Sequence, residues 1–195
     1  MKIIHFVLLI AATHSSSLLA AARQCPKATA FLQKTTGEAK RVMNAEFSSN
    51  WSISGPICSS GYSSFMTDQL SGLCNEPAAI DRVIVHGGSS DEKAVTAVSY
   101  MLTGKVSPLA VRQFIFHITG EEVAEMQEVP APLAPLLRSK RDHRLSFGTS
   151  NGKLFASAYP KDSPDQTQVV IYDLRSISNQ LKEFNQCLRD LGFLE

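Results

Sequence analysis

The chain has 195 residues, of which 44% are hydrophobic and 19% are charged, a composition that suits one compact domain and excludes a disordered tail. Lys and Arg number 19 against 18 Asp and Glu, so the formal net charge is +1. Because a balanced charge creates no strong field toward polyanions, we expect no nucleic-acid partner. Four cysteines are too few for a scaffold that rests on disulfides alone.

The first 22 residues have the pattern of a secretory signal peptide. Lys2 gives a basic start, residues 3–10 are mostly apolar, and Ala20 to Ala22 offer a small-residue cleavage site. We expect cleavage after Ala22, which leaves a single secreted domain over residues 23–195. An uncleaved membrane anchor is the alternative, but the polar residues 13–17 interrupt the apolar run. The pattern predicts a periplasmic or secreted protein without a stable membrane anchor.

The four cysteines all lie in the predicted mature domain, at Cys25, Cys58, Cys74 and Cys187. An even number in an exported protein favours two disulfides, and four cysteines permit three pairings. We favour Cys58 with Cys74, which closes a short loop, and Cys25 with Cys187, which joins the first helix to the last. The spacing fits no zinc site, and we expect neither a metal nor another cofactor.

Apolar periodicity predicts the elements of the mature chain. Apolar residues at intervals of three and four predict a helix over residues 28–47, and the Ser- and Gly-rich residues 48–72 read as loop or short strand. The first three strands are predicted over residues 82–86, 95–102 and 112–118. The acidic residues 119–127 suggest one or two turns of helix, and the proline-rich residues 129–135 suggest a stiff extended connector.

The C-terminal third has the strongest local signals. Residues 145–149 and 153–159 flank Asn151-Gly152, a pair typical of a tight hairpin turn. A strand over residues 167–174 precedes a last helix over residues 176–191, which Gly192 terminates. We detect no internal repeat. The elements predict an α+β domain with an antiparallel sheet of about five to seven strands, on which an N-terminal and a C-terminal helix pack.

A basic segment precedes the predicted hairpin and is the sharpest charge cluster of the chain. Its charged residues are Arg138, Lys140, Arg141, His143 and Arg144. Such a segment suits an anionic partner, such as a glycan, a phosphate or an acidic face of a protein. The alternative is a solvated strand edge that positive charge protects against aggregation.

Catalytic signals in the sequence are weak. His86-Gly87-Gly88-Ser89 resembles the glycine-flanked amides that stabilise an oxyanion, and Ser63, His86 and Asp81 could form a triad only if the fold joins them. A simple glycine turn explains the same residues.

Two further sets of side chains could bind a metal. The mature histidines, His86, His117 and His143, lie on separate segments, so a metal site would need three distant segments to meet. Glu121, Glu122, Glu125 and Glu128 would share a face if they were helical, as an acid/base pair or a calcium site needs, but a solvated acidic turn is the commoner cause. Separately, Asn50-Trp51-Ser52 matches the N-glycosylation pattern; the sequence leaves open whether Asn50 is modified.

The C-terminal strand and helix carry a family resemblance. Residues 168–174, followed by Leu181, Phe184, Cys187-Leu188 and Leu191-Gly192-Phe193, resemble the closing strand and Cys-bearing helix of small exported bacterial proteins. These proteins are the type VI secretion accessory proteins of the VasI type and the invasion-associated locus B type. The resemblance covers the last quarter to third of the chain and implies a periplasmic, non-enzymatic, sheet-based domain.

Taken together, these patterns predict an exported binding or accessory protein, inhibitor-like or immunity-like, that engages another macromolecule through a surface loop or the basic segment. Two alternatives stay open. One is a secreted hydrolase with a Ser/His site that only the fold assembles, and the other is a structural component of an envelope assembly.

Overall fold

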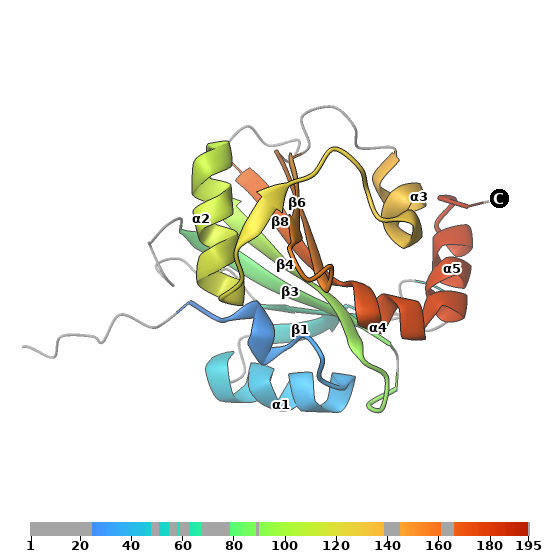
Figure 1. Cartoon of the computed structure of the whole chain (residues 1–195). Helices are drawn as coiled ribbons and strands as arrows, with labels where there is room; N and C mark the ends of the chain where they lie inside the picture. The colour runs from blue at the N-terminus through green and yellow to red at the C-terminus, as the bar shows by residue number, and fades with distance from the viewer. Residues whose placement is uncertain are drawn as a thin grey trace, which may run out of the picture.

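The computed structural model describes residues 25–47, 51–54, 58, 63–67, 79–88, 90–138, 145–160 and 166–194. The predicted signal peptide lies outside these residues. The described residues form one antiparallel sheet of eight strands and five α-helices (Figure 1). The predicted α+β class is confirmed, and the sheet is larger than the five to seven strands expected.

The sheet is built from two halves, each a helix followed by four strands that pair in sequence order. The first half consists of α1 (Thr36–Phe47), β1 (Trp51–Ser54), β2 (Ser63–Thr67), β3 (Ile80–Gly87) and β4 (Val95–Thr103). The second half consists of α2 (Pro108–Thr119), β5 (Val123–Glu125), β6 (Leu145–Thr149), β7 (Leu154–Pro160) and β8 (Gln166–Asp173). The strand order is β1-β2-β3-β4-β8-β7-β6-β5, so the last strands of the two halves pair with each other.

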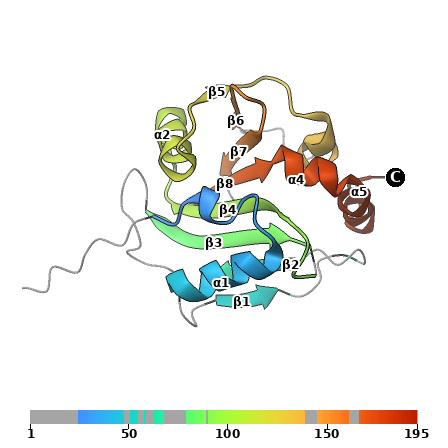
Figure 2. The same cartoon turned by 60° about the horizontal axis from the view of Figure 1, so that its bottom comes forward.

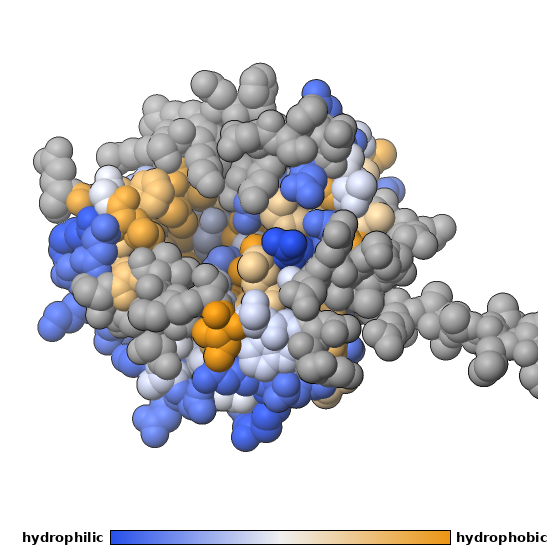
Figure 3. Space-filling model, turned by 180° about the vertical axis from the view of Figure 1, so that it is seen from behind, coloured by the Kyte–Doolittle hydropathy of each residue, from blue (hydrophilic) through white to orange (hydrophobic). Residues whose placement is uncertain are grey.

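The remaining helices divide between the two faces of the sheet. The short 3-10 helix η1 (Ala28–Ala30) lies on one face of the sheet together with α1 and α2. Residues of these three helices form one buried cluster with the sheet residues Val83, Val98 and Val169. The other face carries η2 (Ala131–Leu133), α3 (Ala134–Arg138), α4 (Leu174–Asn179) and α5 (Leu181–Asp190). Figure 2 shows α1 and α4 on either side of the sheet. From behind, hydrophobic residues gather where α3 and α5 lie (Figure 3).

The two halves repeat each other closely, which the sequence analysis did not detect. α1 and α2 both have 12 residues, and the starts of α2 and β5 lie 72 residues after those of α1 and β1 (108 − 36 and 123 − 51). Each helix begins after a hydroxyl residue: Thr35 Oγ1 accepts from Glu38 N, and Ser107 Oγ accepts from Ala110 N. These are N-cap hydrogen bonds.

A four-residue motif marks the same position in both halves. β2 contains Ser64-Phe65-Met66-Thr67, and β6 contains Ser146-Phe147-Gly148-Thr149. Both phenylalanines are buried in the same core cluster. Thr67 Oγ1 accepts from Val83 N at 3.0 Å, and Thr149 Oγ1 accepts from Leu154 N at 3.1 Å. Each threonine therefore satisfies a buried amide of the next strand in its half.

The N-terminal helix is shorter than predicted. Residues 28–47 do not form one helix, because η1 ends early, Gln33 has a φ of 65° and α1 begins only at Thr36. The side chain of Glu38 accepts a hydrogen bond from Thr35 N at 2.8 Å and completes a capping box that fixes the start of α1. Apolar periodicity ran through the break because residues on both sides of it are buried.

The prediction of a strand over residues 112–118 is wrong, because this segment is part of α2. Its buried residues, Val111, Phe114, Ile115 and Ile118, have helical spacing. Pro108 occupies the first turn, and Gly120, with a φ of 72°, ends the helix. The apolar residues Phe114, Phe116 and Ile118 also occupy every second position, as in a half-buried strand, and this spacing led to the strand prediction.

Two neighbouring segments also differ from their predictions. The predicted helical turn in residues 119–127 is wrong, because it contains β5, which pairs with β6. The predicted extended connector over residues 129–135 contains η2 and the start of α3 instead. Proline suits the first turn of a helix, and burial of Leu133 and Leu137 holds this turn on the sheet.

The C-terminal predictions are largely confirmed. β6, β7 and β8 match the predicted hairpin and strand, and Gly152 and Gly192 have the positive φ angles that their roles require. The last helix is divided into α4 and α5 at Gln180, whose side chain donates a hydrogen bond to Ala94 O at 3.0 Å.

Candidate functional site

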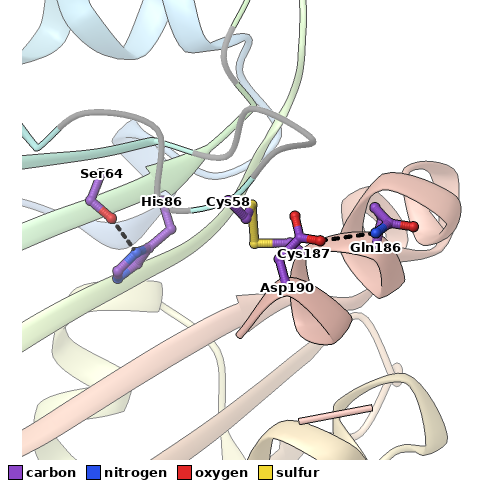
Figure 4. The surroundings of a disulfide bond; sticks show 6 residues. All are labelled: Cys58, Ser64, His86, Gln186, Cys187 and Asp190. Carbon is purple, nitrogen blue, oxygen red and sulfur yellow. Dashed lines mark hydrogen bonds between the residues drawn. A yellow bond between two sulfur atoms is a disulfide. The ribbon is translucent and has the colours of Figure 1, made fainter. Parts of the chain in front are cut away.

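A histidine and two serines, on three neighbouring strands of the first half, are joined by hydrogen bonds. His86 on β3 places Nδ1 2.9 Å from Ser64 Oγ on β2 and Nε2 2.8 Å from Ser99 Oγ on β4. Both serines are buried. Figure 4 shows the contact between Ser64 and His86 in the surroundings of the Cys58–Cys187 disulfide. We call these three residues the Ser-His-Ser network.

The surroundings of His86 keep its imidazole neutral. Burial removes water from the ring and lowers the pKa of His86 to about 4. A neutral imidazole has one donor and one acceptor nitrogen, so one serine accepts a hydrogen bond and the other donates one. At neutral pH the ring is therefore unprotonated but only a weak base. Its two hydrogen bonds fix the three strands to one another.

The predicted catalytic triad is not assembled. The hydroxyl that contacts His86 is that of Ser64, the residue after the predicted Ser63. Asp81 lies five residues before His86 on the same strand, a separation of about 16 Å in extended chain, and its carboxylate accepts a hydrogen bond from Gln166 Nε2 at 3.5 Å. In the part of the chain that the structure describes, the hydrogen bonds of the His86 ring go to serines and not to a carboxylate.

The backbone around the Ser-His-Ser network offers little to stabilise an oxyanion. Ser64 is the second residue of β2, which pairs with β1 on one side and β3 on the other. The glycine turn that resembled an oxyanion loop instead allows a close approach, because a Cβ on Gly87 would lie 2.8 Å from Thr36 Oγ1. Thr36 Oγ1 in turn donates to Gly88 O at 3.1 Å. These contacts favour a structural role for the glycines.

The disulfide pairing that we favoured is wrong. Cys58 is bonded to Cys187 on α5, 129 positions further along the sequence. Cys25 is also part of a disulfide, and Cys74 lies outside the described residues. The short loop between Cys58 and Cys74 suggested a local bridge, but α5 packs on the sheet face that Cys58 shares. Sequence spacing carries no information on that packing.

The structure leaves most of the predicted basic segment untested. Arg138 is the last residue of α3, while Lys140, Arg141, His143 and Arg144 lie outside the described residues. His117 is exposed on α2, and Glu122, Glu125 and Glu128 are exposed along and after β5, not on a helical face. No group of three metal-binding side chains occurs among the described residues.

A shallow depression between α2 and β5 was not predicted. It has a volume of about 270 Å³ and is lined by Leu109, Arg112, Gln113, Phe116, Glu122 and Val123. The α2 side chains among these recur at intervals of three, one and three, which is one face of a helix. We call it the α2-β5 depression. The strand prediction over residues 112–118 hid it, because it placed Phe116 in the core.

None of the described helices is both long and apolar enough to cross a membrane. Searches against protein-family models, curated proteins and solved structures found no significant match.

Proposed function

We propose that this chain is an exported, disulfide-linked binding protein that engages another macromolecule through its surface. The observation that carries the proposal is the Cys58–Cys187 disulfide, which joins the first half of the sheet to the last helix. Disulfides of this kind persist in oxidising compartments such as the periplasm or the extracellular space. The signal-like sequence of residues 1–22 supports the export part of the proposal.

The export part is tested by expressing the full chain in a bacterial host and analysing the periplasmic fraction by intact-mass spectrometry. We expect a product that lacks residues 1–22 and whose mass does not change on treatment with a thiol-alkylating reagent before reduction. A cytoplasmic product with an uncleaved leader and alkylated thiols would overturn the proposal.

The binding part is tested first on the basic segment, with heparin as an anionic glycan probe. We expect the secreted protein to be retained on a heparin column, and the double variant R141E/R144E to elute at clearly lower salt, because each lost cation removes an electrostatic contact. The double variant K182E/R189E on α5, which changes the net charge by the same amount at exposed residues, serves as the control. Equal elution of R141E/R144E and the unmodified protein would exclude the segment as the binding surface.

One observation favours the hydrolase alternative, namely the 2.9 Å contact between Ser64 Oγ and His86 Nδ1. A serine-reactive fluorophosphonate probe tests it. Stoichiometric labelling that disappears in Ser64→Ala would establish an activated serine. Burial of Ser64 within a paired strand leads us to expect no labelling.

A further inference from the structure

We propose that the α2-β5 depression is a docking site for an extended protein segment that carries a bulky apolar side chain next to a carboxylate. The proposal rests on the binding function proposed above and names a surface and a partner class for it. It draws on described residues only and does not involve the basic segment.

The first argument is the exposure of two large apolar side chains on α2. Leu109 is 65% exposed and Phe116 is 52% exposed, and both line the depression. They lie seven residues apart, which places them two turns apart on the same side of the helix. The opposite side of α2 already supplies the core with Val111, Ile115 and Ile118. α2 thus carries large apolar side chains on two sides, and in the described part of the chain those on only one side are buried.

The first half of the molecule is an internal control for this arrangement. The residues 72 positions before Leu109, Arg112, Gln113 and Phe116 are Gly37, Lys40, Arg41 and Asn44 on α1. At the same place in the same local fold, α1 therefore has glycine or polar residues throughout. Since α1 folds without an apolar side chain there, Leu109 and Phe116 are not required by the helix-on-sheet packing.

The corner between helix and edge strand is filled in the first half. Trp51 on β1 donates a hydrogen bond from Nε1 to Asn44 Oδ1 at 3.0 Å, and its ring meets Phe65 edge to face at 6.1 Å. The residues at the same positions in the second half are Val123 and Phe116. Val123 is too small to fill the corner between α2 and β5, and the depression left there has a volume of about 270 Å³. A cavity of about 150 Å³ holds a benzene ring, so one large side chain fits.

The cation of the depression, Arg112, indicates a carboxylate in the partner. In the first half, Lys40 pairs with Asp91 at 2.6 Å and lies over the Phe65 ring. Arg112 is its counterpart in the depression. Among the described residues it forms no ion pair, not even with Glu122, which also lines the depression. An arginine beside exposed apolar side chains binds a carboxylate in bidentate geometry. An acidic residue next to the apolar anchor would therefore complete the site.

The position of β5 favours an extended partner. β5 is the last strand in the sheet order and pairs with β6 on one side, and Figures 1 and 2 show it beside α2. The backbone groups on the outer side of such a strand can pair with an added strand. A segment that pairs there would lay alternate side chains toward α2.

The test is selection of a phage-displayed library of random dodecapeptides on the secreted, oxidised protein obtained from the full chain. We expect enrichment of peptides with Phe, Trp, Leu or Met within two residues of Asp or Glu. A synthetic peptide from the selection should bind Phe116→Asn, which copies the first half, at least tenfold more weakly. Leu191→Asn removes a 43% exposed leucine elsewhere and should bind unchanged. Circular dichroism checks that each variant is folded.

Charge reversal separates the site from general stickiness. Selection on Arg112→Glu should favour peptides with Lys or Arg beside the apolar residue in place of Asp or Glu. Peptides that bind the unmodified protein and Phe116→Asn equally would overturn the docking site while leaving the binding function intact. Enrichment with no acidic preference, or the same preference in Arg112→Glu, would overturn the assigned partner chemistry.

Discussion

The two halves of the sheet share one architecture and differ in what they do with it. Both keep the N-cap hydroxyl, the buried phenylalanine and the threonine that satisfies a neighbouring strand. They differ elsewhere. The first half has the Ser-His-Ser network and a corner that Trp51 fills, whereas the second half has the open α2-β5 depression. The shared residues show what this helix-and-four-strand unit needs, and the differing residues are where a function can reside.

The largest effect is expected from the link between the first half and the last helix. In the chain-entropy model, a bridge that closes a loop of 129 residues stabilises the folded state by up to about 5 kcal/mol. The double variant C58S/C187S should therefore lose most of that amount in urea unfolding. An unchanged unfolding midpoint would show that packing of α5 alone holds the two parts together.

Substitutions of the two equivalent phenylalanines should show whether the two halves contribute equally to the stability of the core. Phe65 and Phe147 are both almost fully buried, and Phe65→Ala and Phe147→Ala should each reduce the free energy of unfolding by roughly 3 to 5 kcal/mol. Phe65 additionally contacts Trp51 and Lys40, so we expect the larger loss there. A much larger loss in Phe147→Ala would contradict this ranking.

The Ser-His-Ser network should make the first half sensitive to acid. The pKa of His86 is about 4 in the folded state, against 6.5 for an unperturbed histidine. The unfolded chain therefore binds a proton first as the pH falls, and stability decreases from about pH 6.5 toward pH 4. The loss attributable to His86 amounts to roughly 3 kcal/mol at most. His86→Gln can keep hydrogen bonds to both serines but does not titrate.

Urea unfolding at several pH values between 7.5 and 4 measures this difference. The gap in stability between the unmodified protein and His86→Gln should shift in favour of the variant as the pH decreases. A gap that does not change with pH would show that the ring is well solvated in the folded protein.

The smallest effect is expected from the repeated threonines. Thr67→Val and Thr149→Val keep the side-chain shape but leave Val83 N and Leu154 N without their hydrogen bonds. Each should cost about 1 to 3 kcal/mol. Because five strand spacings, about 24 Å, separate β2 from β6, the two losses should add in the double variant. Strong non-additivity would show that the halves are coupled through the sheet.

Local sequence determined several elements of this protein. Asn151-Gly152 specifies its own hairpin, because Gly152 readily adopts the positive φ of the turn. The strands around Val85 and Val98 follow from β-branched residues. The α+β class follows from the mixture of these patterns with the amphipathic C-terminal segment. In each case the deciding interaction lies within a few residues of the chain.

Other features were decided only by the tertiary structure. Residues 112–118 satisfy both a strand and a helix pattern, and packing of Ile115 and Ile118 against the sheet selects the helix. The partner of Cys58 depends on where α5 lies, and Ser64 meets His86 only through the register of β2 with β3. The α2-β5 depression follows from the contrast between Trp51 and Val123, which begin the first strand after the helix in their respective halves. Sequence carries short-range preferences, whereas these outcomes depend on contacts between segments far apart in the chain.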